Sequence, residues 1–178
     1  MIYFNCDYLE GGHPKILEKM LSTNMEQLTG YSTDHYCDSA RERIRQACGC
    51  PDADVHFLVG GTQTNLTAIA SILRPYQGVL AAHDGHIACH ETGAIEATGH
   101  KVLPIPCVDG KITADQVREF CHSHQTNTMR EHMVQPGMVY ISFPTEIGSL
   151  YTKKELQELS AACHENGIPL YIDGARMG

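Results

Sequence analysis

The sequence lacks the features of a secreted, membrane-spanning or nucleic-acid-binding protein. Its 13 lysines and arginines stand against 21 aspartates and glutamates, a formal net charge of -8 at pH 7. That balance offers no basic surface for nucleic acid or anionic lipid. The start of the chain has no basic segment followed by a long apolar run, so we expect neither a signal peptide nor a transmembrane helix. These absences predict a cytoplasmic protein that binds a small molecule.

The usual metal and nucleotide motifs are also missing. The eight cysteines include Cys48-Gly49-Cys50 and the run Cys121-His122-Ser123-His124, but neither is a paired Cys-x-x-Cys knuckle of a zinc site. Without an export signal, reduced thiols are expected rather than disulfides. No Gly-Lys-Ser/Thr or Gly-x-Gly-x-x-Gly motif is present, which excludes the P-loop and the usual dinucleotide fingerprint.

The most informative stretch runs from Val55 to Leu73. Its apolar residues at 55–59 predict a short strand, Gly60-Gly61 predicts a turn, and the apolar spacing that follows predicts a helix capped by Thr62 or Thr64. The first amides of such a helix attract an anion, above all a phosphate. A glycine turn before a helix is also a common plain connection, so the residues alone leave both interpretations open.

Helices and strands are expected to alternate along the rest of the chain. We predict an irregular arm over 1–13 and an α/β core over 14–178, since this length supports one domain rather than two. The expected helices begin at Pro14, after a cap at Asp38 or Ser39, after the loop 83–86, and after capping boxes at Thr113 and Thr152. The expected strands cover 79–82, 101–105, 138–142 and 169–172. The alternation predicts a mostly parallel sheet with helices on both faces.

Three candidate positions are expected at the carboxyl ends of strands, where ligands of α/β sheets bind. They are Gly61, His86 and Asp173. Asp173 leaves a buried strand and needs a partner, which is either a ligand or Arg176 in an internal ion pair. His86 is likewise either a ligand-binding or a surface histidine.

Several short motifs together resemble a known family. They are Asn5-Cys6-Asp7, Gly30-Tyr31-Ser32-Thr33-Asp34, Gly60-Gly61-Thr62-Gln63-Thr64-Asn65, Gly85-His86-Ile87 with Glu91-Thr92-Gly93-Ala94, and Ile172-Asp173-Gly174-Ala175-Arg176. Their order is similar to that of the threonine aldolases that depend on pyridoxal phosphate, and of the related β-eliminating lyases of the aspartate-aminotransferase fold (fold type I). The resemblance covers essentially the whole chain, which matches the N-terminal part of the family's large domain.

The resemblance implies pyridoxal 5'-phosphate as the cofactor. Gly61, Thr62 and Gln63 would hold the cofactor phosphate. His86 would stack on the pyridine ring, Asp173 would pair with the ring nitrogen and keep it protonated, and Arg176 would contact the phenolic oxygen or its neighbourhood.

The resemblance also implies an amino acid substrate and a site for it. A threonine-like β-hydroxy amino acid would be cleaved to glycine and an aldehyde, with His86 as the base or as the residue that orients a water. Tyr31 and Cys6 would lie near the substrate. Cys6 stands where the family usually has serine, and a thiol is a weaker hydrogen-bond donor than a hydroxyl.

Two elements of the family have no counterpart among the matched positions. None of the lysines corresponds to the one that binds the cofactor covalently, and the small C-terminal domain is not matched. We therefore expect residues 1–178 alone to be an incomplete, inactive part of an enzyme that forms a homodimer or homotetramer. Three alternatives remain open: an aromatic amino acid β-eliminating lyase, a non-catalytic phosphate-binding module, and a purely structural α/β domain.

Overall fold

A computed structural model describes residues 2–3, 6 and 8–177. The chain forms two compact units, an N-terminal unit (Met1–Phe57) and a C-terminal unit (Leu58–Gly178). The expected division into an arm over 1–13 and a core over 14–178 stays a prediction, and Asn5 and Asp7 of the first motif lie outside the described residues.

The N-terminal unit contains two helices, α1 (Pro14–Thr23) and α2 (His35–Cys48), and neither has a buried residue. Helix α1 begins at the predicted proline. Helix α2 begins earlier than expected, because the carboxylate of Asp34, rather than Asp38 or Ser39, accepts the amides of Tyr36 and Cys37. It ends at Gly49, which adopts the left-handed conformation that favours glycine.

The C-terminal unit is an α/β layer structure, as predicted. Its strands are β1 (Gln77–Ala82), β2 (Lys101–Ile105), β3 (Gln135–Ser142) and β4 (Leu170–Asp173), and they form one parallel sheet in the order β2-β1-β3-β4. Its helices are α3 (Gly61–Ile72), α4 (His86–Cys89), α5 (Ala94–Ala97), α6 (Ala114–Thr126), α7 (Lys153–Glu165) and the 3-10 turn η1 (Arg130–His132). No helix in the described part of the chain is long and apolar enough to cross a membrane.

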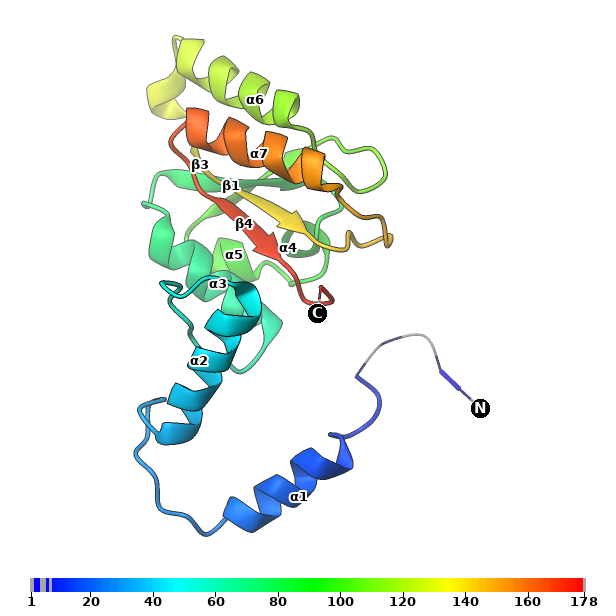
Figure 1. The fold of residues 1–178 in the computed structure, drawn as a ribbon. Coiled ribbons are helices and arrows are strands. Elements are labelled where there is room, and N and C mark those ends of the chain that lie inside the picture. The colour runs from blue at the N-terminus through cyan, green and yellow to red at the C-terminus, as the bar shows by residue number, and fades with distance from the viewer. Residues whose placement is uncertain (1, 4–5, 7, 178) are drawn as a thin grey trace. The chain divides into compact units, whose positions relative to one another are not determined.

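Helices cover both faces of the sheet, with α6 and α7 on one side and α3, α4 and α5 on the other (Figure 1). Alternate residues of each strand pack against the two helix layers, since successive side chains of a strand point to opposite faces. Leu80 and Val139 pack under α6 and α7, whereas Val79 and Met138 pack under α3 to α5. Both predicted capping boxes, at Thr113 and Thr152, are present.

The predicted strand over 55–59 is not formed. No strand in the described residues pairs with this segment, and a strand is stable only when a neighbour satisfies its amides. Instead, the amide of Val59 donates to the side chain of Gln63 at 2.9 Å, and Val59 is 96% exposed.

Two further boundaries differ from the prediction. Strand β3 starts at Gln135 and includes Pro136 and Gly137, which were expected to stop the preceding segment. The register shifts there, and a Cβ on Gly137 would lie 2.8 Å from the Cβ of Gln77 and 2.7 Å from Leu73 Cδ2, so the close approach favours glycine. The single helix expected before Thr98 is two short helices, α4 and α5, separated by a turn at 90–93.

Candidate functional site

The carboxyl ends of three neighbouring strands meet at one edge of the C-terminal unit. Strands β1, β3 and β4 run parallel and side by side, and Ser142 at the end of β3 pairs in register with Asp173 at the end of β4 (Figure 1). His86 begins α4, four residues after β1 ends. We call the side chains gathered here the polar rim; they are Asn65, His86, Glu91, Tyr140, Glu146, Tyr171 and Asp173.

Asp173 is held by donors from other elements of the unit. Its Oδ2 accepts hydrogen bonds from the Tyr140 hydroxyl at 2.6 Å and from Asn65 Nδ2 at 3.0 Å. Its Oδ1 accepts the amide of Ala175 at 3.2 Å. Charge-assisted hydrogen bonds of this kind are stronger than neutral ones and fix the carboxylate in place.

Asn65, on α3, connects the rim. Its Nδ2 donates to Glu91 Oε1 at 2.8 Å as well as to Asp173, and its Oδ1 accepts the Tyr171 hydroxyl at 2.8 Å. Asn65 and Glu91 are both 2% exposed. Glu91 Oε2 is buried and has no hydrogen-bond partner among the described residues. A buried carboxylate without a full set of partners is costly, which marks this edge as a site rather than a packed core.

His86 lies between two carboxylates. Its Nε2 is 3.7 Å from Glu91 Oε1 and its Nδ1 is 3.3 Å from Glu146 Oε1. The backbone amide of His86 donates to the Ser142 hydroxyl at 3.3 Å. The imidazole remains 36% exposed, so it is oriented by the rim and still accessible to a ligand. A positive charge on this ring would be stabilised by both neighbours.

Burial and the nearby carboxylates keep the rim tyrosines protonated. Burial, reinforced by the hydrogen bond to Asp173, raises the pKa of Tyr140 far above its ordinary value of 10.0. Burial, with smaller contributions from Asp173 and Glu91, raises the pKa of Tyr171 to about 12. Both hydroxyls therefore act as donors at neutral pH.

The raised pKa of Tyr140 predicts a loss of stability in alkali. The folded protein keeps the Tyr140 proton at pH values where the unfolded chain has lost it. The contribution of this tyrosine to the free energy of unfolding is therefore complete below about pH 10. Above that pH it falls by up to about 1.4 kcal/mol per pH unit. Urea unfolding between pH 9 and pH 11.5 measures the slope. Tyr140→Phe should flatten it and Tyr76→Phe, at an exposed tyrosine, should not; equal slopes in all three proteins would contradict the assignment.

Replacing Asn65 by alanine is expected to destabilise the protein by about 2 to 4 kcal/mol, because the change removes the hydrogen-bond donor to the buried Glu91 carboxylate and the acceptor of the half-buried Tyr171 hydroxyl. The free energy of unfolding in urea measures the effect. Ser71→Ala on the exposed side of the same helix is the matched control and should change stability by less than about 0.5 kcal/mol. Similar effects of the two substitutions would show that the rim network contributes little.

The first turn of α3 offers its amides without a side-chain cap. The N-cap residue is Gly60, and no side chain caps the helix, so neither Thr62 nor Thr64 takes the predicted capping role. Thr64 Oγ1 instead donates to the Gly60 carbonyl. A Cβ on Gly60 or Gly61 would meet nothing within 4 Å. Asn65 lies four residues after Gly61, about 6 Å along the axis, so this helix end is close to Asp173.

Five of the predicted site residues belong to this edge or to the helix end beside it. They are Gly61, Thr62, Gln63, His86 and Asp173. The side chain of Gln63 already accepts the amide of Val59. Arg176 follows in the turn after β4. Cys6 and Tyr31 belong to the N-terminal unit, so their nearness to the site stays a prediction.

Sequence patterns alone predict no role for five residues of the rim, which are Asn65, Glu91, Tyr140, Glu146 and Tyr171. Asn65 and Glu91 lie within the motifs quoted above, and this position is the only feature of the sequence that points to them. Tyr140 and Tyr171 occupy buried or half-buried strand positions, where a tyrosine needs a partner for its hydroxyl.

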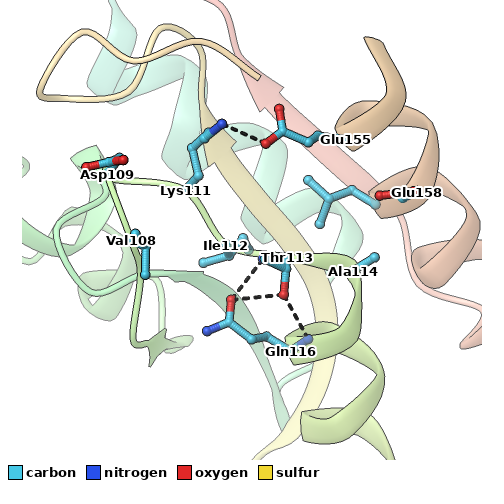
Figure 2. A pocket seen from close by; sticks show the side chains of 10 residues that line it. Val108, Asp109, Lys111, Ile112, Thr113, Ala114, Gln116, Glu155 and Glu158 are labelled. Carbon is cyan, nitrogen blue, oxygen red and sulfur yellow. Dashed lines mark hydrogen bonds and ion pairs between the residues drawn. The ribbon is translucent and has the colours of Figure 1, made fainter. Parts of the chain in front are cut away.

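A separate cavity lies between the β2–α6 connection and the start of α7 (Figure 2). Its volume is about 560 Å³. Four of its polar side chains already bind one another: Lys111 Nζ pairs with Glu155 at 2.6 Å, and the Thr113 hydroxyl and the Gln116 side chain complete the capping box. With these side chains paired, the cavity offers fewer polar groups to a ligand than the polar rim does.

The C-terminal unit is an α/β structure, with a parallel sheet and helices on both faces. In such structures ligands bind outside the carboxyl ends of the strands, which is where the polar rim lies. The sequence model of the beta-eliminating lyase family matches residues 4–178. The chain therefore belongs to that family.

Individual relatives agree with this assignment. The chain is 31% identical over 175 residues to a low specificity L-threonine aldolase of Pseudomonas sp., covering 97% of this chain and 49% of that protein. A solved threonine aldolase of Leishmania major is 50% identical, with a TM-score of 0.89 over 96% of this chain and 48% of that one. A C-S lyase from Staphylococcus hominis, solved with PLP bound, shares the fold at 14% identity and a TM-score of 0.63. The chain spans about half the length of the curated relatives it matches most fully.

Proposed function

We propose that this chain forms part of a lyase that depends on pyridoxal phosphate and cleaves threonine-like β-hydroxy amino acids to glycine and an aldehyde. The observation that carries the proposal is the fixed carboxylate of Asp173, held by Asn65 and Tyr140 beside the uncapped start of α3. The threonine aldolase relatives supply the substrate class.

The chemistry of the available groups fits this cofactor. The uncapped amides at Gly61 and Thr62 suit a phosphate, since a helix N-terminus carries a partial positive charge. Asp173 suits a protonated pyridine nitrogen, and the accessible ring of His86 suits the face of an aromatic ring. Bound pyridoxal phosphate supplies an electron sink that stabilises negative charge at the substrate's α-carbon.

Six of the seven rim residues then have a definite task in this reaction. Asp173 keeps the ring nitrogen protonated, while Tyr140 and Asn65 keep Asp173 in position. His86 takes the proton of the substrate β-hydroxyl as the Cα–Cβ bond breaks and the aldehyde leaves, and a proton returns to Cα to give glycine. Glu91 and Glu146 stabilise the charge that His86 gains.

The proposal extends to the assembly, since the resemblance implies a homodimer or homotetramer. Light scattering of the purified protein at its natural length measures this directly. A mass of two or four subunits supports it, and a monomer in the active preparation contradicts it.

Product analysis tests the proposed reaction. The protein at its natural length is incubated with pyridoxal phosphate and L-threonine, and glycine and acetaldehyde are measured, with β-substituted amino acids assayed in parallel for pyruvate and ammonia. Equal amounts of glycine and acetaldehyde are expected. Pyruvate and ammonia without glycine would favour a β-eliminating lyase, and cofactor binding without any product would favour a non-catalytic module.

A further inference from the structure

Three side chains of the kinds that bind transition metals gather at the ends of β1 and β2. His83 and Asp84 directly follow β1, and Cys107 lies two residues after β2. Their ligand atoms all lie within 4.8 Å of one another. Cys107 Sγ is 3.0 Å from Asp84 Oδ1 and 3.4 Å from His83 Nδ1.

We propose that His83, Asp84 and Cys107 form a zinc-binding site. Tetrahedral zinc, with bonds of about 2.3 Å to sulfur and about 2.0 to 2.2 Å to nitrogen or oxygen, holds neighbouring ligand atoms roughly 3.3 to 3.8 Å apart. The separation of Cys107 from His83 falls in that range, and that of Cys107 from Asp84 needs only a small side-chain rotation. A thiolate with an imidazole selects zinc over magnesium or calcium, which prefer oxygen ligands.

The sheet holds the backbone of the three ligands in place. Ala82 and Ile105 pair in register at the ends of β1 and β2. The amide of His83 donates to the Ile105 carbonyl at 2.9 Å, and the amide of Gly85 closes a turn onto the Ala82 carbonyl at 2.9 Å. The ligands therefore lie within two residues of paired strand positions, and a cation meets a largely preformed set of groups.

The simpler interpretation is a hydrogen bond from the Cys107 thiol to Asp84. In that arrangement the thiol carries its proton and donates it to the Asp84 carboxylate. Zinc would take the place of that proton, which passes to solvent as the sulfur–metal bond forms. The exposed side of His83 leaves the fourth coordination position to water.

The site is separate from the polar rim but shares its loop. Gly85 and His86 follow Asp84 directly, so a bound cation would fix the segment that begins α4. This inference stands independently of the proposed catalytic function, because it depends only on metal binding by three side chains.

Cobalt substitution tests the site. Purified protein at its natural length is dialysed against a chelator and titrated with Co²⁺, and the difference spectrum is recorded. One equivalent should produce a thiolate-to-cobalt charge-transfer band together with the visible bands of tetrahedral cobalt, and Zn²⁺ should displace it. Cys107→Ser should abolish the charge-transfer band. His83→Ala should weaken affinity by about 100-fold or more, because even losing a residue that only orients a ligand commonly costs about 10- to 100-fold.

Cys48→Ser is the control, because Cys48 is an exposed cysteine and belongs to the sequence pattern first considered for zinc. It should leave the spectrum unchanged. The proposal is overturned if wild-type protein gives no charge-transfer band, or if Cys48→Ser removes the band and Cys107→Ser does not.

Discussion

Asp173→Asn is expected to lower the rate of substrate cleavage by roughly 10²- to 10³-fold, because the amide cannot hold the cofactor's ring nitrogen protonated while charge develops on the substrate. Asparagine has nearly the same shape, and its oxygen still accepts from Tyr140 and Asn65, so the fold should remain intact. Steady-state kinetics with saturating cofactor measure the loss.

Cofactor affinity should fall in the same variant. The loss of one charge-assisted hydrogen bond costs about 1.5 to 3 kcal/mol, or roughly 10- to 100-fold in the dissociation constant. Asp115→Asn is a suitable control, since Asp115 lies on α6 with a side chain that is 94% exposed. If Asp173→Asn binds the cofactor as tightly as wild type, a phosphate-binding module that does not use Asp173 becomes the better account.

His86 substitutions should separate two tasks of one side chain. His86→Ala removes both the ring and the proton acceptor, so it should weaken cofactor binding and lower kcat by roughly 10²- to 10⁴-fold. His86→Phe keeps an aromatic face for stacking but cannot take a proton. We therefore expect near-normal cofactor affinity with the same loss of kcat.

The exposed His122 on α6 provides the control, and His122→Ala should behave as wild type in both assays. A His86→Phe variant that retains more than about a tenth of wild-type kcat would show that another group, such as a water, takes the proton. That outcome would leave the cofactor site in place and change only the assignment of the base.

Local signals predicted most of the elements correctly. The capping boxes at Thr113 and Thr152 begin helices through bonds within four residues, so the sequence contains all the information needed. The segment 55–59 has an equally clear apolar pattern, yet it forms no strand, because a strand depends on a neighbour that a local pattern cannot specify. The same reason explains why the sequence predicts a stop at Gly137, since its close contacts with Leu73 and Gln77 arise only in the tertiary structure.

The site shows a similar division. That His86 and Asp173 lie at strand ends followed from the alternation of elements, and the parallel sheet brings those ends to one edge. The hydrogen bonds that connect these residues could not be predicted from the sequence. Asn65 contacts Asp173 across 108 positions of sequence, and no periodicity or capping rule predicts a contact of that range. The sequence likewise does not predict the cluster of His83, Asp84 and Cys107, because its members follow two different strands.

A structure determined with pyridoxal phosphate bound tests the central claim most directly. We predict that the cofactor phosphate accepts the backbone amides of Gly61 and Thr62, while the ring nitrogen lies within hydrogen-bond distance of the Asp173 carboxylate. A cofactor whose phosphate lies away from the start of α3, or whose nitrogen faces a residue other than Asp173, would contradict the account.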